Sequence, residues 1–163
     1  PFKILLTVSL ILGFMCIGLM SCTSEYFKAI SFIALHMNPN IRDTVNSILK
    51  GIENVKLIEP LSYPYLIWLM NKSYFVLTDS GGIQEEAPTL GKPVLVMRKV
   101  TERQEGVEAG TAKLVGSDFD NIVKECKLLL DNQIHYENMA NAINPYGDGT
   151  TSLQILNFMK DNN

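Results

Sequence analysis

The sequence has few of the residues that build metal centres or disulfide frameworks. Its three cysteines (Cys16, Cys22 and Cys126) have no metal-ligand spacing, and an odd number does not suit a disulfide framework. Two histidines, His36 and His135, are too few for a histidine-rich metal site. We therefore expect no bound metal, and a reducing, cytoplasmic environment.

The sequence also has no excess of basic residues. Fourteen lysines and arginines stand against 17 acidic residues, for a net charge of -3. Nucleic-acid binding and general binding to anionic membranes are therefore not expected. A length of 163 residues with 47% apolar content fits one domain with a sizeable core.

Charged residues are missing from one stretch, residues 4–24, where most positions are apolar. A signal peptide or membrane span fits this length, and so does a buried strand at "FKILLTV" followed by a buried helix. Membrane association is not expected, although this stretch leaves it open. We treat residues 1–35 as a divergent apolar segment and 36–163 as the main domain.

From residue 36 on, helix and strand patterns alternate. Asn38 and Pro39 favour a helix start, and Gly51 favours its end. Uninterrupted apolar runs predict strands that are covered on both faces. The pattern predicts an α/β fold, a Rossmann-like parallel sheet flanked by helices. The predicted strands are "VKLIEP" from 55 and residues 74–78, 92–97 and 112–116, and the later helices cover 62–73, 118–132 and 151–160.

The stretch "LTDSGGIQEEAPTLGKPVLVMR" carries the strongest functional signal. Ser80, Gly81 and Gly82 follow the end of a predicted strand and open a helix. Free amides and the helix dipole favour an anion there, and glycine lets a phosphate come close to the main chain. Of Glu85 and Glu86, one can turn toward the same ligand and accept hydrogen bonds from a vicinal diol such as a ribose. A tight turn beside a solvated glutamate pair explains the same residues.

Basic residues cluster beyond the next strand. Arg98, Lys99 and Arg103 could neutralise a diphosphate. The segment "TERQEGVEAGT" that follows is polar and irregular, which suits a binding loop and equally a solvated loop.

Four motifs together resemble the non-hydrolysing bacterial UDP-N-acetylglucosamine 2-epimerases, from about His36 to Lys160. They are "HMNPNIRD", "LTDSGGIQEEAPTLGKPVLVMR", "TERQEGVEAGTAKLVG" and "NPYGDGTTS". The resemblance implies the C-terminal, nucleotide-binding domain of a two-domain GT-B fold. It also implies interconversion of UDP-N-acetylglucosamine and UDP-N-acetylmannosamine by elimination and re-addition of UDP, with no cofactor.

The resemblance also implies residue roles. Ser80, Gly81 and Gly82 would hold the diphosphate, Glu86 the ribose hydroxyls, and Arg103 would lie on the phosphate side of the cleft. His36 would lie near an interdomain site where a regulatory substrate molecule binds in this family. The aromatic residue that usually meets uracil is replaced by Leu66, with Tyr65 beside it. The loop 144–149 suits a tight turn.

Two departures from the family shape the expected function. The family's His-Arg-Arg-Glu-Asn motif after the first strand of this domain is absent, and so is the domain that supplies carboxylates for the C2 proton. We therefore expect a fragment that binds the UDP of a UDP-sugar without activity alone, and no residue is assigned a catalytic role. A separate N-terminal-domain polypeptide or a homodimer would complete it. The alternatives are a nucleotide-sugar-binding subunit of a GT-B glycosyltransferase and a non-catalytic remnant.

Overall fold

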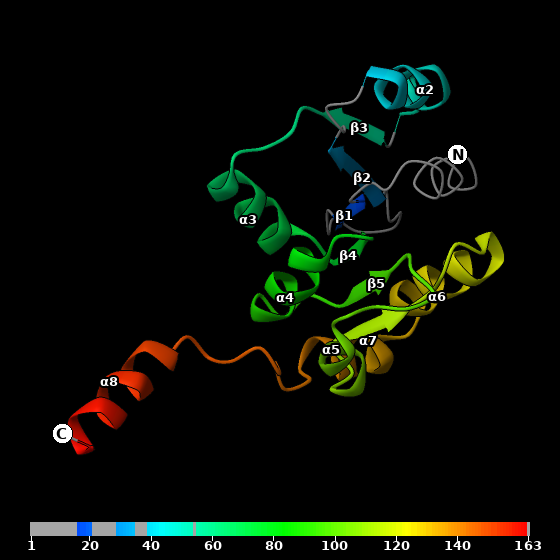
Figure 1. Ribbon diagram of the computed structural model, residues 1–163. Coiled ribbons are helices and arrows are strands. Elements are labelled where there is room, and N and C mark those ends of the chain that lie inside the picture. The colour runs from blue at the N-terminus through cyan, green and yellow to red at the C-terminus, as the bar shows by residue number, and fades with distance from the viewer. Residues whose placement is uncertain (1–15, 21–28, 35–38, 54, 163) are drawn as a thin grey trace.

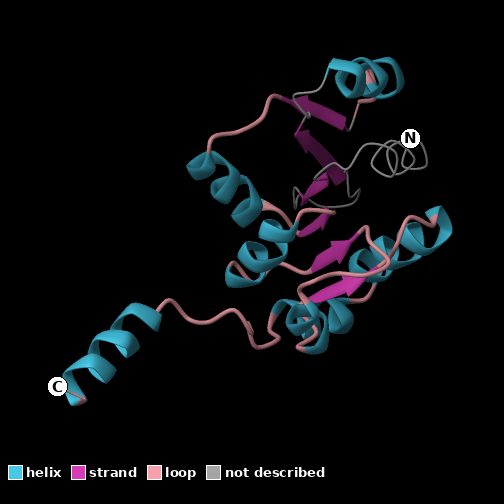
Figure 2. Ribbon diagram, viewed as in Figure 1, coloured by secondary structure: helices cyan, strands magenta, loops and turns pink. Residues whose placement is uncertain are grey.

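Six strands in the described part of the chain form one mixed sheet in the order β3-β2-β1-β4-β5-β6. The computed structural model describes residues 16–20, 29–34, 39–53 and 55–162. Figure 1 shows the sheet running through the body of the molecule with helices beside it, and Figure 2 separates the strands from the helices by colour. The strands are β1 (Cys16–Met20), β2 (Ala29–Ala34), β3 (Val55–Ile58), β4 (Phe75–Thr78), β5 (Val94–Val96) and β6 (Ala112–Leu114). The helices are α2 (Pro39–Leu49), α3 (Tyr63–Lys72), α4 (Gly81–Thr89), α5 (Gln104–Glu108), α6 (Phe119–Asp131), α7 (Gln133–Ala140) and α8 (Thr151–Asp161).

The α/β prediction of parallel strands flanked by helices is confirmed. Strands β4, β5 and β6 pair in parallel, as do β2 and β3. Alternate residues of β4 enter different cores: Phe75 and Leu77 pack on one side of the sheet, and Val76 on the other. Because both faces are covered, these strands have no polar alternation, as the sequence indicated.

Strand β1 departs from the all-parallel expectation, because it is antiparallel to both of its neighbours, β2 and β4. Residues 21–28 connect β1 to β2. This connection is shorter than the roughly twelve or more residues that a parallel crossover needs. Residues 16–20 are thus a strand and not part of the buried helix considered for this region. The possible strand at "FKILLTV" lies outside the described residues.

Two hydrophobic cores lie on opposite faces of the sheet. One gathers side chains from α2, α6 and α7, including Leu49, Ile122 and Leu129, each at most 1% exposed. The other gathers side chains from α3 and α4, including Met70 and Ala87. Because β4 and β5 supply residues to both cores, the loops after these two strands are anchored by strands that are buried on both faces.

Helix α8 stands apart from these cores. Figure 1 shows it at the end of a long connecting segment, away from the sheet. It buries no residue, and its apolar side chains Leu153, Ile155, Leu156, Phe158 and Met159 are all exposed. The helix itself was predicted correctly, and its packing within this chain contributes little to stability.

Candidate nucleotide-binding site

The carboxyl end of β4 turns directly into α4, as the sequence predicted. Buried Thr78 accepts a hydrogen bond from the Ser80 amide at 3.0 Å, which fixes the turn. Ser80 is the N-cap residue of α4, yet its side chain makes no capping hydrogen bond. Its hydroxyl and the first amides of the helix are therefore placed to bind an anion.

Gly81 and Gly82, at this helix start, differ in what surrounds them. A methyl group on Gly82 would meet nothing within 4 Å, so this position opens on free space. A methyl group on Gly81 would lie 3.6 Å from Arg103 Cζ and 3.7 Å from Arg103 Nη2. The structure therefore brings Arg103 to the glycine turn, 22 positions away along the chain.

Arg103 is held in this position by ion pairs. Its Nε donates to Glu85 Oε1 at 2.6 Å, and its Nη1 lies 3.4 Å from Glu102 Oε1. The hydrogen bond to Glu85 is the main reason that the pKa of Arg103 is raised above its usual value. With Nε bonded to Glu85, the planar guanidinium is oriented so that Nη2 faces Gly81.

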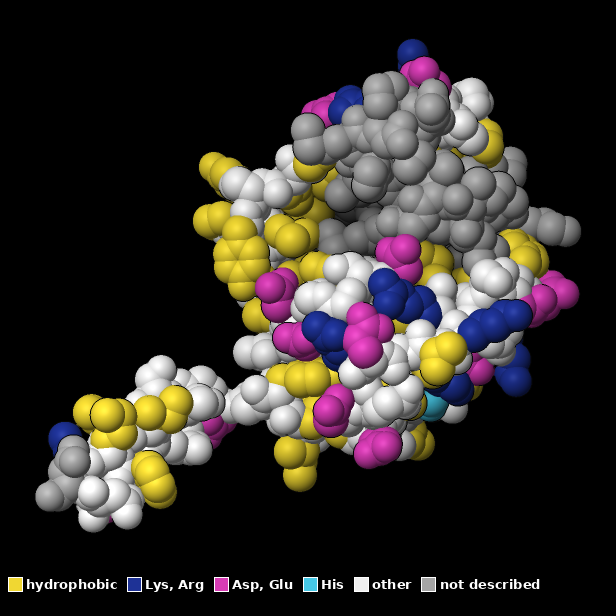
Figure 3. Space-filling view, viewed as in Figure 1, with side chains coloured by type: hydrophobic (Ala, Val, Ile, Leu, Met, Phe, Trp, Pro, Cys, Tyr) yellow, Lys and Arg dark blue, Asp and Glu magenta, His cyan; other side chains and the backbone are white. Residues whose placement is uncertain are grey.

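Glu102 adds a negative charge beside this site. Its Oε2 lies 3.1 Å from Arg98 Nη1, and its Oε1 would lie 3.6 Å from a methyl group on Gly81. A hydrogen bond from its own backbone amide is the largest effect and lowers the pKa of Glu102 below its usual range. Burial, the next largest effect, opposes this shift, and the charges of Arg98 and Arg103 add to it. Figure 3 shows acidic and basic side chains interleaved on this face of the molecule.

The adjacent glutamates of α4 face different partners. Glu85 binds Arg103, whereas Glu86 lies beside Tyr63 at the start of α3. The charge of Glu86 is the largest of the effects that raise the pKa of the Tyr63 hydroxyl, followed by burial and by a hydrogen bond to the same carboxylate. Sequence reasoning allowed one of the two glutamates to face the ligand, and it did not anticipate that the other would hold Arg103.

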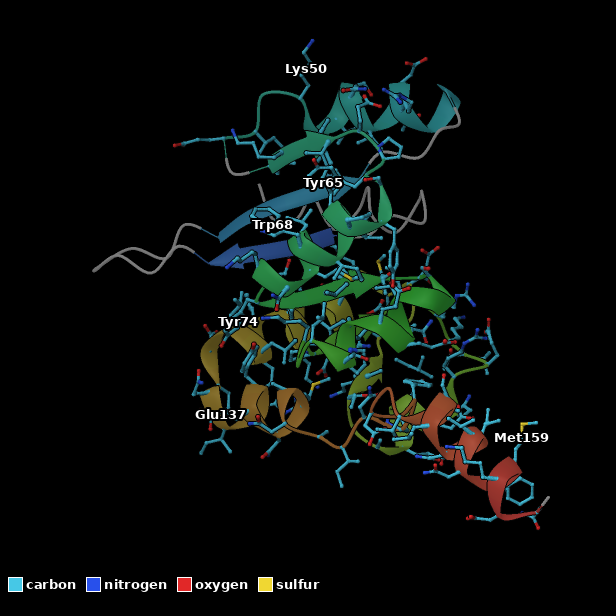
Figure 4. The ribbon with its side chains drawn as sticks, turned by 90° about the vertical axis from the view of Figure 1, so that its left-hand side faces the viewer. Lys50, Tyr65, Trp68, Tyr74, Glu137 and Met159 are labelled. Carbon is cyan, nitrogen blue, oxygen red and sulfur yellow. The ribbon has the colours of Figure 1, made fainter. Side chains whose placement is uncertain are left out.

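The α3 side of the site is aromatic and exposed. Tyr65 and Trp68 are 68% and 58% exposed and line a hollow of about 470 Å³ with Pro64. Figure 4 shows Tyr65 and Trp68 on α3, and Figure 3 shows hydrophobic side chains gathered over this helix. Leu66, at the position expected to meet uracil, packs partly against the core. The ring of Tyr65 is therefore more accessible to a ligand than the side chain of Leu66.

The loop after α7 reaches back to Arg103. Tyr146 lies against Gly106, where a methyl group would come within 2.6 Å of the tyrosine oxygen, and its hydroxyl donates to the Arg103 carbonyl at 3.5 Å. Asp148 accepts hydrogen bonds from the amide and the hydroxyl of Thr150, which confirms a tight turn. The segment expected to be irregular contains the short helix α5 that meets Tyr146.

The family model for UDP-N-acetylglucosamine 2-epimerases matches residues 16–160, nearly the whole chain. The chain belongs to the UDP-N-acetylglucosamine 2-epimerase family. The resemblance inferred from the four motifs is confirmed, and the match extends toward the N-terminus to include β1 and β2.

Curated epimerases share more than half of their aligned residues with this chain. The UDP-N-acetylglucosamine 2-epimerase of Campylobacter jejuni is 55% identical over 125 residues, which are 77% of this chain and 33% of that protein. The Escherichia coli O157:H7 enzyme is 55% identical over 128 residues, 78% of this chain and 34% of that protein. The chain thus spans about a third of the length of the curated relatives it matches.

Solved epimerase structures contain the same fold. The Neisseria meningitidis UDP-GlcNAc 2-epimerase bound to UDP-GlcNAc superposes with a TM-score of 0.75 at 51% identity, covering 80% of this chain and 36% of that one. The Methanocaldococcus jannaschii enzyme in complex with UDP-GlcNAc and UDP gives 0.63 at 30% identity, covering 79% and 35%. The expected likeness to part of a two-domain epimerase is confirmed.

Three further expectations concern metals, membranes and His36. Within the described ranges, no group of three or more histidine, cysteine, aspartate or glutamate side chains could hold a metal ion. No helix of that same part of the chain is long and apolar enough to cross a membrane. His36, expected near a regulatory site, lies outside the described residues.

Proposed function

We propose that this chain binds the UDP moiety of UDP-N-acetylglucosamine and forms the nucleotide-binding wall of a 2-epimerase site. The observation that carries the proposal is the meeting of Arg103 Nη2 with Gly81 at the N-terminus of α4. Ser80, the amides of Gly81 and Gly82, and Arg103 would bind the diphosphate. The bound UDP-GlcNAc of the N. meningitidis relative supports this ligand class.

Glu86 would bind the ribose hydroxyls. It is one helical turn inside α4, far enough from the first amides to avoid the diphosphate. Tyr63 lies beside its carboxylate, and α3 continues from there to the exposed ring of Tyr65. A nucleoside extending from α4 toward α3 would therefore meet a carboxylate first and an aromatic surface next. This order suits a ribose followed by a base.

We further propose that the 163-residue polypeptide does not epimerise alone. Removing the C2 proton needs a base within hydrogen-bond reach. Three glutamates near the turn already have other tasks: Glu85 pairs with Arg103, Glu102 with Arg98, and Glu86 is assigned to the ribose. The opposite wall would come from a further epimerase domain, or from a second copy of this chain.

Titration calorimetry with UDP and uridine tests the binding proposal. We expect UDP to bind more tightly than uridine, with an affinity that falls as salt is added. Equal affinity for the two ligands would overturn the assignment of the diphosphate.

Gly82→Ala sharpens this test, because the added methyl group meets no protein atom. It should leave the fold intact and raise stability by up to about 1 kcal/mol, since alanine is the better helix former. The methyl group would nevertheless occupy space that the diphosphate needs. We expect weaker UDP binding with unchanged uridine binding, and unchanged UDP binding would place the ligand elsewhere.

A further inference from the structure

A polar side chain lies in the apolar face of α4. Gln84 is 0% exposed, between the buried residues Ile83 and Ala87 that pack into the core below this helix. Burying an amide is costly unless both of its ends are hydrogen-bonded. Leucine or methionine would fill the same volume without this requirement, so the contacts of Gln84 need an explanation.

Both ends of the Gln84 amide are bonded, and each bond leads to the nucleotide site. Its Nε2 donates to the carbonyl of Ser80 at 3.1 Å. Its Oε1 accepts from the hydroxyl of Thr101 at 2.7 Å, a residue that is 5% exposed. The same Thr101 oxygen accepts the backbone amide of Arg103 at 3.1 Å. A continuous series of hydrogen bonds, with Gln84 and Thr101 buried at its centre, thus joins Ser80 to Arg103.

The donors and acceptors in this series of hydrogen bonds run in a fixed direction. The hydroxyl of Thr101 has one proton, which it gives to Gln84, so its lone pairs are left to accept from Arg103. The amide of Gln84 must then point its NH₂ group at Ser80. Gln104 Nε2 adds an outer support by donating to the Thr101 carbonyl at 2.7 Å. Each bond in the series depends on the orientation of the one before.

We propose that Gln84 and Thr101 are positioning residues that set the Arg103 loop against the first turn of α4. The inference rests on the proposed diphosphate site, because it assigns these residues to that site's geometry. Glu85 fixes the guanidinium plane of Arg103, and the hydrogen bonds through Gln84 and Thr101 fix its backbone. Binding that depends on several donors converging on one diphosphate is sensitive to shifts of about 1 Å.

Thr101→Val tests the proposal, since it keeps the shape and removes the hydroxyl. We expect UDP affinity to fall roughly tenfold and uridine affinity to stay unchanged. Thr101→Ser, which restores the hydroxyl, should return UDP affinity to within about twofold of the parent. A merely structural role would lower stability without changing the ratio of UDP to uridine affinity.

Thr111→Val is the matched control. Thr111 is 2% exposed and donates to the carbonyl of Gly106, so the substitution also removes one buried hydroxyl bond, away from α4. It should reduce the unfolding midpoint like Thr101→Val while leaving the affinity ratio unchanged. An equal fall of the ratio in both variants, or no rescue by serine, would overturn the proposal.

Two further measurements keep the test decisive if Thr101→Val does not fold. Gln104→Ala loosens Thr101 from the exposed side and should lower the UDP-to-uridine ratio about two- to threefold. No change in that ratio would contradict the proposal. In an Arg103→Ala background, Thr101→Ser and Gln104→Ala should have no further effect on UDP affinity. A parent chain that binds UDP no better than uridine would instead refute the diphosphate site itself.

Discussion

Glu85 and Glu86 show how one helical step separates two tasks. Successive residues of a helix point about 100° apart, so neighbours cannot share a target. Glu85 therefore reaches Arg103 on the α5 side of α4, and Glu86 reaches Tyr63 on the α3 side. In the proposed site, the pair would therefore serve two different parts of the nucleotide: Glu85 the diphosphate, through Arg103, and Glu86 the ribose.

Glu86→Gln should weaken UDP binding more than Glu85→Gln. Loss of a charged hydrogen-bond acceptor costs on the order of 1.5–3 kcal/mol, and Glu86 is assigned a direct contact with the ribose. Because uridine has the same ribose, Glu86→Gln should weaken uridine as well. Glu85→Gln should affect UDP alone, through Arg103. Calorimetry with both ligands separates the two patterns, and a larger UDP loss in Glu85→Gln would reverse the assignment.

For Glu102 we predict the opposite effect: its substitution should tighten UDP binding. Its carboxylate lies at the turn where the diphosphate is proposed to bind, held there by Arg98 and Arg103. Glu102→Gln removes this competing charge and should tighten UDP binding roughly two- to fivefold at low salt. Glu105→Gln, at an exposed position of α5, is the control and should have no effect. Weaker UDP binding in Glu102→Gln would indicate that the carboxylate supports the site.

Local signals found some site residues, and only the fold could reveal others. The glycine turn and Arg103 were expected on one ligand because each follows a predicted strand end. The bond between Thr101 and Gln84 joins residues 17 positions apart, and Tyr146 meets Gly106 across 40 positions. Such pairs depend on how loops pack against helices. The one local signal of these contacts was Gln84, a polar residue in the apolar face of α4 that needs a buried hydrogen-bond partner.

At the scale of elements, composition predicted the four strands after residue 36, but it predicted neither β1 nor β2. Runs such as "YFVLT" and "KPVLVM" contain no alternation, so burial on both faces was inferred correctly. Strand β1 is apolar too, but nothing within "CIGLM" encodes an antiparallel direction. Direction follows from the length of the connection and from the partners available, which are properties of the whole sheet.

Helix α7 is fixed to β4 by two stacked tyrosines. The rings of Tyr74 and Tyr136 lie 4.0 Å apart with an interplanar angle of 12°, and the Tyr136 hydroxyl donates to the Tyr74 carbonyl at 3.0 Å. Burial, followed by the proximity of Tyr74, raises the pKa of Tyr136 above 10.0. The folded chain therefore keeps this proton at pH values where the unfolded chain has lost it.

Tyr136→Phe should lower stability at neutral pH by about 1 kcal/mol, through loss of one hydrogen bond. The contribution of the raised pKa is complete below the ordinary tyrosine value near pH 10 and is lost as pH rises through the folded value. Urea unfolding between pH 8 and 11 should therefore show a shallower alkaline decline in the variant. Tyr65→Phe, at an exposed position, should leave the neutral-pH stability unchanged. An equally steep decline in Tyr136→Phe would contradict the assignment.

On the scale of the whole molecule, the residues of the proposed site are gathered at one end of the sheet. They come from the loops after β4 and β5 and from the helix starts beside them. Ligands of open α/β sheets bind at the carboxyl ends of the strands, and the turn proposed to bind the nucleotide lies there. This arrangement suits recognition of UDP. Elimination of UDP needs in addition a dry, closed site and a base on the sugar.

The purified 163-residue chain should therefore show no 2-epimerase activity. Interactions with UDP alone stabilise substrate and transition state about equally, so they do not accelerate the chemical step. The measurement is incubation with UDP-N-acetylglucosamine in deuterated water, followed by NMR. Deuterium at C2, or UDP-N-acetylmannosamine above a control without protein, would show that this chain or a second copy of it supplies the base. If exchange appears only after a separately expressed N-terminal epimerase domain is added, the chain is a competent nucleotide-binding wall, and Gly82→Ala should abolish that recovery.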